Sequence, residues 1–373
     1  MKSQVSIVKC NSYNHSLVFE ATKKAIELIG GISSFVRPES RILVKPNILM
    51  AKEPEFGIDT HPEVVRAVIK ILKEINCEIF VGDGPSVWGN QAKNVDNVYE
   101  RAGIKSICEE EKVSLVKFDK RRWRGKFPLT TWLDNCDYLV SIPKFKTHDL
   151  TILTGAIKNL FGLVSGTYKT ELHKKYFDRE PFAGILVDIF QEAKPALTVV
   201  DGIVAMEGDG PGTSGKLRDL NLLLASADCV SLDSIMALIM GLEPFDILTT
   251  KEAVSRGMGI ADINSIEIFG EKLEEVIVES FLLPTTSSFK KNIPRPVINL
   301  AKKLIKYYPC VERDNCIRCA ACIQACPNQA ISMKNERIIF DYSKCIACFC
   351  CQEACPASAI KVKKSILAKI VGL

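Results

Sequence analysis

The sequence predicts an α/β protein in which a mainly parallel, layered sheet domain precedes a small, cysteine-rich α+β domain. Over residues 1–283, short apolar runs alternate with amphipathic stretches, a pattern typical of parallel sheets covered on both faces. Near the C-terminus, eight of the 15 cysteines fall in two copies of one spacing. With 373 residues, 47% of them hydrophobic, the chain is long enough for about two domains.

The expected strands and helices follow from the spacing of apolar side chains. Residues 1–8 alternate polar and apolar side chains and predict a first strand, without the long apolar core of an export signal. Further strands are expected at residues 41–44, 78–81, 138–142, 197–200 and 221–224. Helices are expected over residues 18–29, 62–75 and 230–240, where apolar side chains recur at helical spacing.

Composition divides the chain into four parts, of which residues 1–283 form the first. Residues 284–308 begin polar and proline-marked and become amphipathic from 297, which predicts a linker and a short helix. The small domain covers residues 309–360, with a hairpin expected at residues 330–333 and 337–340. Residues 361–373 form a basic amphipathic tail, for which docking on the protein or a partner is favoured over binding to an anionic membrane.

The two cysteine runs share one spacing and lie 29 residues apart, from Cys316 to Cys345. Each run reads Cys-x2-Cys-x2-Cys-x3-Cys-Pro, the spacing of bacterial two-cluster ferredoxins, in which the fourth cysteine ligates the other cluster. The expected ligands are Cys316, Cys319, Cys322 and Cys355 for one [4Fe–4S] cluster, and Cys345, Cys348, Cys351 and Cys326 for a second. Zinc sites use paired ligands, and disulfide frameworks suit short secreted chains, so both alternatives fit less well.

Charge and hydropathy exclude some classes of function. The net charge is only +5, and no basic stripe with interleaved aromatic side chains indicates a nucleic-acid binder. No apolar run reaches the roughly 18 residues of a membrane-spanning helix. Free thiols and clusters together predict a reducing compartment, with the cytoplasm as the default.

Polar side chains follow the expected strands, and ligands in open α/β sheets bind beyond the carboxyl ends of strands. The candidate substrate ligands are Lys45, Asn47, His61, Lys144, Lys146, His173, Asp201, Glu207 and Asp228. The lysines, with Lys158, favour an anionic ligand such as a carboxylate or phosphate, against the alternative of a solvated basic face. His148 is the candidate for proton transfer because it lies among lysines that lower its pKa, and Asp83 is a second candidate. The alternative for His61, which precedes Pro62, is to organise a helix start.

A glycine-rich segment at residues 210–216 matches the spacing of a phosphate-binding loop. Leu217, however, stands where that motif needs Ser or Thr for magnesium. Residues 219–224 also predict a strand where the motif opens a helix. The segment is therefore expected to be a turn.

The sequence resembles the DUF362 family, a group of uncharacterised proteins often fused to a C-terminal ferredoxin module. The resemblance lies in residues 44–47, 59–63, 82–85, 143–148, 155–162, 201–202, 207–211 and 225–228. The family is also distantly similar to the lactate racemase superfamily, whose members carry a nickel-pincer nucleotide on a lysine and use histidines for hydride and proton steps. That similarity implies a test of Lys158, with His148 and His173 beside it.

Three functions remain open from the sequence. The main hypothesis is a ferredoxin-coupled oxidoreductase, in which clusters pass low-potential electrons from a partner protein to an anionic substrate or an organic cofactor at the strand-end rim. The second is an electron-transfer subunit whose α/β domain docks a partner protein, which predicts no enclosed pocket. The third is a lactate-racemase-like enzyme with structural clusters.

Overall fold

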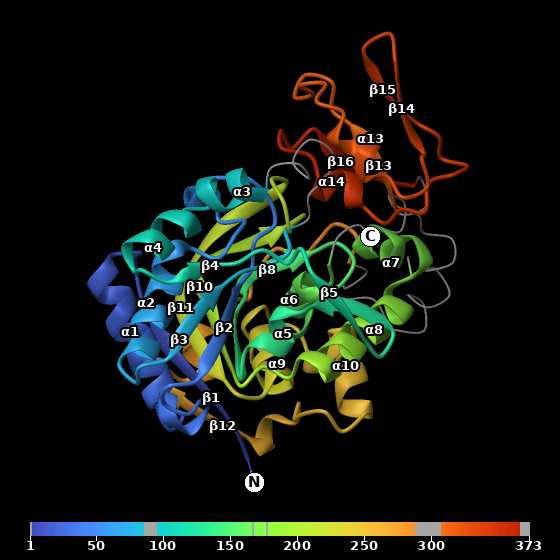
Figure 1. Cartoon of the computed structure of the whole chain (residues 1–373). Coiled ribbons are helices and arrows are strands. Elements are labelled where there is room, and N and C mark those ends of the chain that lie inside the picture. Colours follow the sequence, from blue (N-terminus) through green and yellow to red (C-terminus); the bar gives the residue numbers. More distant parts are fainter. Residues whose placement is uncertain (1, 86–94, 166–167, 177, 288–306, 366–373) are drawn as a thin grey trace.

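The computed structural model describes residues 2–85, 95–165, 168–176, 178–287 and 307–365. The helix expected at residues 297–308 falls almost wholly outside these residues, as does the tail from residue 366 onwards. Figure 1 shows the cysteine-rich module, in orange and red, seated at one end of the larger α/β domain.

The α/β domain is built on one ten-stranded sheet. Its main row runs β12 (Ile266–Gly270), β1 (Ser3–Lys9), β11 (Gly215–Ser226), β10 (Leu197–Gly208), β7 (Tyr138–Ile142), β2 (Arg41–Pro46), β3 (Glu78–Val81) and β4 (Ser114–Leu115). Within this row only β11 runs antiparallel to its neighbours. β8 (Lys144–His148) adds parallel to β10, and β9 (Ile152–Thr154) pairs antiparallel with β8.

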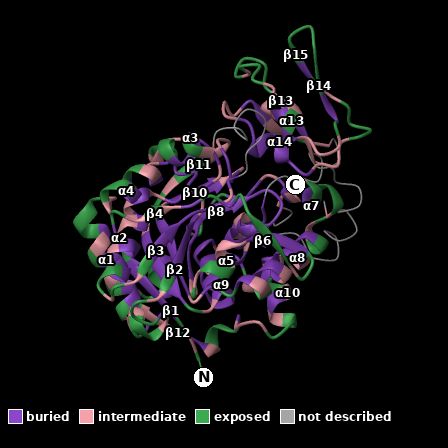
Figure 2. Ribbon diagram, in the orientation of Figure 1, coloured by how far each residue is buried: buried purple, intermediate pink, exposed green. Residues whose placement is uncertain are grey.

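Helices cover both faces of the sheet, so the expected layered α/β fold is confirmed (Figure 1). One face packs on α1 (His15–Glu27), α2 (Pro62–Lys73) and α4 (Ile104–Glu110), and the other on α6 (Ala156–Asn159), α8 (Arg179–Ala193) and α9 (Cys229–Ile239). Alternate side chains of β2 point to opposite faces of the sheet. Ile42 and Val44 pack in the core with α1, α2 and α4, and Leu43 packs in the core with α6, α8 and α9. The central strands β2, β3, β7 and β10 are accordingly almost wholly buried (Figure 2).

Shorter elements complete the α/β domain. They are α3 (Val95–Arg101), α5 (Trp132–Asn135), α7 (Tyr168–Lys175), α10 (Leu248–Ser255), α11 (Leu273–Val276), β5 (Arg121–Arg124) and β6 (Phe127–Thr130). A 3-10 turn, Leu160–Leu163, follows α6 directly and helps to shape the site described below.

Two segments that were expected to follow the ends of strands are themselves parts of strands. Residues 144–148 form strand β8, and β10 continues through Asp201 to Gly208, so these residues lie in strands and not in loops. β10 continues as a strand because it pairs with β11 along its length, apart from a register shift between Gly202 and Val204. β8 in turn pairs with β10. The glycine-rich segment that matches the spacing of a phosphate-binding loop forms the turn between β10 and β11, as expected from Leu217.

The cysteine-rich module contains β13 (Tyr307–Val311), α13 (Ala321–Ala325), β14 (Ile331–Lys334), β15 (Arg337–Phe340), α14 (Cys350–Glu353) and β16 (Ile360–Lys364). Its expected hairpin is β14–β15, shifted by one residue, and Asn335 and Glu336 form the turn with positive φ angles. The expected boundaries at residues 308/309 and 360/361 are corrected, because they cut β13 and β16. These strands pair antiparallel, with Tyr307 opposite Lys364.

The module is an internal duplication in its backbone as well as its sequence. Left-handed conformations at Arg318, Ala320 and Gln329 recur 29 residues later at Ala347, Phe349 and Ser358. Such turns direct successive N–H groups into a concavity that suits anionic iron–sulfur centres.

The turn between β10 and β11 holds the module on the α/β domain. The Thr213 hydroxyl donates to the carbonyl of Cys355 at 2.7 Å and accepts from the Ser358 amide at 3.2 Å. The Ser358 hydroxyl in turn donates to the Thr213 carbonyl at 2.5 Å. The glycine-rich segment is therefore a docking seat for the second cysteine run.

Candidate functional site

A cleft with about 480 Å³ of empty space, mouth included, lies where the α/β domain meets the module. Its lining comprises Asn47, Ile48, Leu49, Asp83, Gly84, Lys146, His148, Thr154, Lys158, Asn159, Phe161, Gly162, Lys169, His173, Pro211 and Glu353. We call it the Lys158 pocket. Glu353 comes from the module, and every other lining residue comes from the α/β domain.

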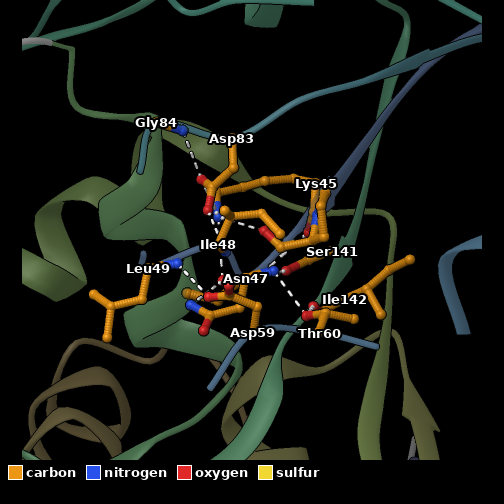
Figure 3. A network of polar contacts seen from close by, with 12 residues as sticks. Lys45, Asn47, Ile48, Leu49, Asp59, Thr60, Asp83, Gly84, Ser141 and Ile142 are labelled. Carbon is orange, nitrogen blue, oxygen red and sulfur yellow. Dashed lines mark hydrogen bonds and ion pairs between the residues drawn. The ribbon is translucent and has the colours of Figure 1, made fainter. Parts of the chain in front are cut away.

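A buried ion pair underlies the pocket (Figure 3). The Lys45 ammonium lies 2.8 Å from Oδ1 of Asp83, and both side chains are almost fully buried. The second oxygen of Asp83 accepts from the amide of Ile48 at 2.8 Å. Burial lowers the pKa of Lys45, and the charge of Asp83 opposes that effect. The pair thus ties the end of β2 to the segment after β3.

Two glycines flank the helical turn that carries Lys158, and each leaves room for a carboxylate. A Cβ atom on Gly162 would lie 2.1 Å from Oδ1 of Asp83, and one on Gly155 would lie 2.0 Å from Oδ1 of Asp233. The Asp233 carboxylate accepts from the amide of Ala156 at 2.6 Å, at the start of α6. Only glycine therefore fits at both positions.

Three lysines give the pocket its positive character. Lys146 donates to the carbonyl of Ile58 at 2.6 Å, and burial lowers its pKa to about 7. Lys169 donates to the carbonyl of Gly84, and burial lowers its pKa to about 8. Lys158 is partly exposed in the pocket, 5.7 Å from the ring centroid of Phe161, and burial lowers its pKa too.

His148 contacts Glu353 across the boundary with the module. Its Nε2 lies 3.0 Å from Oε1 of Glu353, without the alignment of a hydrogen bond, so the contact is electrostatic. Nδ1 of His148 accepts from the amide of Leu150 at 3.0 Å. In the neutral ring, the proton therefore belongs on Nε2, the atom that faces Glu353.

The protonation states follow from burial and neighbouring charges. Burial, reinforced by Lys158, lowers the pKa of His148 to about 4, although Glu353 opposes this. Burial also lowers the pKa of His173 to about 4. Burial raises the pKa of Glu353, but His148, Lys158 and His173 outweigh it and bring that pKa to about 2. Near neutral pH the two rings are neutral and the carboxylate is charged.

The first set of expected cluster ligands surrounds one hollow of about 300 Å³ in the module. Its lining includes the four cysteines Cys316, Cys319, Cys322 and Cys355. The last of these comes from the second run, as the crossed assignment requires. The amide of Ala359 donates to Sγ of Cys355 at 3.2 Å, a hydrogen bond suited to a thiolate ligand.

The second set also gathers cysteines from both runs. Burial is the largest cause that raises the pKa of Cys351. Neighbouring thiolate charges raise it further, those of Cys348, Cys345, Cys322 and Cys326. Cys326, from the first run, accepts a hydrogen bond from the amide of Ala330 at 3.2 Å. Both sets thus have the composition that an iron–sulfur cluster requires, and the first also surrounds a hollow.

Comparison with known proteins assigns both parts of the chain. Residues 42–238, more than half of the chain, match the model of a domain of unknown function, DUF362. This chain belongs to the DUF362 family. Residues 315–359 match the model of a 4Fe-4S dicluster domain, which gives this DUF362 protein an iron–sulfur electron-transfer role.

Two individual proteins are similar to this DUF362 chain. The thylakoid-associated protein sll1697 of Synechocystis sp. is 31% identical over 256 residues, which cover 67% of this chain and 78% of that protein. The lactate racemase apoprotein from Thermoanaerobacterium thermosaccharolyticum has a TM-score of 0.39 and 13% identity. That match covers 61% of this chain and about half of the racemase chain, 55%. Among the residues that the structure describes, every helix is too short or too polar to span a bilayer.

The structure brings together about half of the residues that the sequence suggested for the DUF362 domain. The lining includes Asn47, Asp83, Lys146, His148, Lys158 and His173. Lys45 lies beneath them, in its ion pair with Asp83.

The other suggested residues lie outside the pocket. Lys144 and Asp201 form a buried ion pair at 2.8 Å, and the same Asp201 oxygen accepts from the backbone amide of His61 at 2.9 Å. His61 also caps α2, the alternative that the sequence offered. These three residues join strands to a helix start.

Glu207 and Asp228 have similar structural partners. Glu207 lies 3.1 Å from Arg218 and accepts from the amide of Leu282. Asp228 caps α9 through the amides of Val230 and Ser231.

Sequence reasoning missed Glu353 and did not select Lys169 as a ligand. A signal for Glu353 exists, because the equivalent position of the first cysteine run is Gln324, 29 residues earlier. Gln324 is exposed and Glu353 is buried. The acid thus departs from the repeat at the point where the module meets the pocket.

Proposed function

We propose that this protein is a ferredoxin-coupled oxidoreductase that binds a small anionic substrate in the Lys158 pocket. The observation that carries the proposal is the position of Glu353. This residue lies between Cys351 and Cys355 in the chain and lines the same pocket as His148 and Lys158. Glu353 therefore belongs both to the cluster module and to the lining of the substrate site.

The cysteines would hold two clusters in the crossed arrangement. Cys316, Cys319, Cys322 and Cys355 would hold one, and Cys345, Cys348, Cys351 and Cys326 the other. When bound, [4Fe–4S] clusters supply single electrons at low potential. The same cysteine-rich composition suggests a reducing compartment, such as the cytoplasm.

The charge of the pocket supports an anionic substrate. Asp83 is already paired with Lys45, and Asp59 acts on Lys146 from beside the pocket. Among the lining residues this leaves Glu353 to oppose Lys158 and Lys169. A carboxylate or phosphate would restore the balance and accept hydrogen bonds from the ammonium groups. Such an anion also suits the amide of Asn47, which already donates to Asn159 at 3.1 Å and so is held in place.

The pocket's own side chains have distinct roles in this proposal. His148 carries a hydrogen on Nε2 and, as a neutral ring, can donate a hydrogen bond from it to the substrate, because its Nδ1 accepts from a backbone amide. The lysines orient the anion. Phe161, Ile48 and Pro211 line the remaining wall and exclude water from the reacting atoms. A cleft of this kind favours the enzyme over a subunit that only docks a partner.

Anaerobic re-oxidation of the reduced protein tests the proposal. Protein reduced with dithionite would be mixed with small anionic acceptors, and the visible absorption of the clusters followed. We expect at least one acceptor to re-oxidise the protein, and Lys158→Met to slow this step while the clusters remain intact. Glu267→Gln, at an exposed position on edge strand β12, is the control. Failure of every acceptor, or equal rates in both variants, would contradict the proposal.

A further inference from the structure

Lys158 differs from the buried lysines in and around the pocket in having no polar partner. Lys45 and Lys144 are ion-paired at 2.8 Å, to Asp83 and Asp201 respectively. Lys146 and Lys169 donate to backbone carbonyls. Among the described residues, the Lys158 ammonium has neither a hydrogen bond nor an ion pair. It makes a cation–π contact with the ring of Phe161. Its nitrogen is therefore free to meet a ligand.

The position of Lys158 is also central. Its charge acts on Lys146, His148, Lys169 and His173, and each of these side chains lines the pocket. The amine thus shares the pocket with two neutral rings and with two lysines that would hold an anion. A substrate held by Lys146 or Lys169 would place its neighbouring carbon within the reach of Lys158.

We propose that Lys158 is an amine nucleophile that forms an imine with the carbonyl carbon of an anionic substrate. The substrate class is a carbonyl compound with a carboxylate or phosphate group, such as a 2-oxo acid or a phosphorylated aldehyde. The inference deepens the proposed function of the same pocket, but imine formation itself requires no electrons.

The chemistry balances without a further reactant. The Lys158 nitrogen attacks the carbonyl carbon, and a carbon–nitrogen bond forms while the carbonyl π bond opens to a carbinolamine. The carbon–oxygen bond then breaks, and the oxygen leaves as water with the two hydrogens of the neutral amine. His148, with its proton on Nε2, is the group placed to assist the departing oxygen.

The electrostatic setting suits a nucleophilic lysine. Such lysines are activated by desolvation and by neighbouring cations. Burial lowers the pKa of Lys158, Lys45 lowers it further, and Glu353 and Cys350 oppose this shift. Each unit by which a lysine pKa falls raises the unprotonated fraction about tenfold near neutral pH.

Reductive trapping tests the inference on the anaerobically purified full chain. The protein would be incubated with pyruvate, or with pyridoxal 5′-phosphate, and then with cyanoborohydride, and its lysines mapped by peptide mass spectrometry. We expect adduct occupancy on Lys158 about tenfold above that on Lys146, Lys169 or the exposed lysines, because backbone carbonyls hold the first two amines and the exposed lysines are mostly protonated. Inorganic phosphate should compete with both probes.

Lys158→Arg is the matched variant, because it keeps the charge and removes the nucleophilic amine. It should abolish the pocket adduct, while exposed lysines still react. If Lys158 reacts no faster than exposed lysines in the native protein, the inference is wrong, whatever the variant does. If Lys158 is trapped but no anion re-oxidises the reduced clusters, the oxidoreductase proposal fails and the imine site stands.

Discussion

Nε2 of His148 lies 3.0 Å from Oε1 of Glu353, so an imidazole of the α/β domain meets a carboxylate of the cysteine-rich module. Both side chains are buried, and the ring is oriented by the Leu150 amide at its other nitrogen. The contact joins the Lys158 pocket to the segment between Cys351 and Cys355 through two side chains. Folding of the module and completion of the pocket are therefore linked.

Glu353→Gln should destabilise the protein, because the amide keeps the shape but loses the charge that the pocket favours. A pKa lowered to about 2 means that the folded state prefers the carboxylate over a neutral group. We expect a loss of about 1–3 kcal/mol in the free energy of unfolding at neutral pH, because Lys158 and the Nε2 hydrogen of His148 lose the carboxylate that they face, and urea denaturation of the anaerobic protein measures it. The control is Glu336→Gln, an exposed partner of Arg318, which should change this free energy by less than about 0.5 kcal/mol. Equal stability of the two variants would contradict the assigned charge state.

His173 should make the fold sensitive to mild acid. Its pKa of about 4 lies below the value of about 6.5 in an unfolded chain, so the unfolded state binds more protons between these values. Stability must then rise with pH across this window and fall on acidification. From about pH 7 to about pH 5 the loss from this one residue is about 2 kcal/mol.

His173→Phe removes this titration and keeps an aromatic ring against Phe182, on which His173 stacks. The variant should lose less stability than the native protein between the two pH values. Asp59 titrates in both proteins, so its effect cancels in the comparison. The His173 charge lowers the pKa of His148 only as a minor cause, after burial, Lys158 and Glu353, so the contribution of His148 changes little. Urea unfolding followed by tryptophan fluorescence provides the measurement, since Trp123 and Trp132 lie in the α/β domain. Parallel pH profiles would show that the ring does not titrate as described.

Much of the fold was accessible from apolar spacing alone. β3 and β7 match the expected runs because central strands buried on both faces are continuously apolar. The sequence does not predict strand β8, because Lys144, Lys146 and His148 make it polar. Its burial depends on partners such as Asp201 and the Ile58 carbonyl, which are distant in the chain and leave no local pattern.

The site was predictable in its residue types but not in its boundaries. The sequence selected Lys158 and His148 because they follow strand-like runs, and both line the pocket. Lys144 looks equivalent to Lys146 in sequence, yet the first pairs with Asp201 and the second lines the pocket. Glu353 could not be assigned to the pocket, because its role depends on how the module docks.

Gly162→Ala should disrupt the floor of the pocket. The new Cβ would lie 2.1 Å from Asp83 and 2.6 Å from the Lys45 ammonium, so the buried ion pair would have to separate. Breaking a buried pair costs about 3–5 kcal/mol, and thermal denaturation should show a loss of this order. Gly184→Ala, in helix α8 with the nearest atom at 3.7 Å, should instead stabilise by about 0.5–1 kcal/mol. A tolerated Gly162→Ala would mean that the pair is not fixed as described.

Thr213→Val should loosen the module from the α/β domain. The hydroxyl makes two hydrogen bonds to the second cysteine run, and valine leaves the Cys355 carbonyl and the Ser358 amide without that partner. We expect a cost of about 1–3 kcal/mol and faster amide hydrogen exchange in residues 350–360. Thr213→Ser keeps the hydroxyl and is the matched control. Identical exchange in the two variants would rule out the turn as a docking seat.

The crossed assignment of cysteines makes a sharp prediction about iron content. If Cys326 serves the second cluster, Cys326→Ser should remove about half of the iron and leave the first cluster. Adding Cys345→Ser should remove no more, because both residues would serve the same cluster. Adding Cys316→Ser should remove the rest, because Cys316 lines the other hollow. Cys77→Ser, in the α/β domain, is the control and should keep all the iron.

Iron analysis and electron paramagnetic resonance of the anaerobic variants distinguish this pattern from its alternative. In an uncrossed module, Cys326 would belong with Cys316, Cys319 and Cys322. The double variant with Cys316 would then lose only half of the iron, and the double variant with Cys345 would lose all of it. The two arrangements thus predict opposite outcomes for the same pair of proteins. The presence of Cys355 beside the first run, and of Cys326 near Cys351, favours the crossed arrangement.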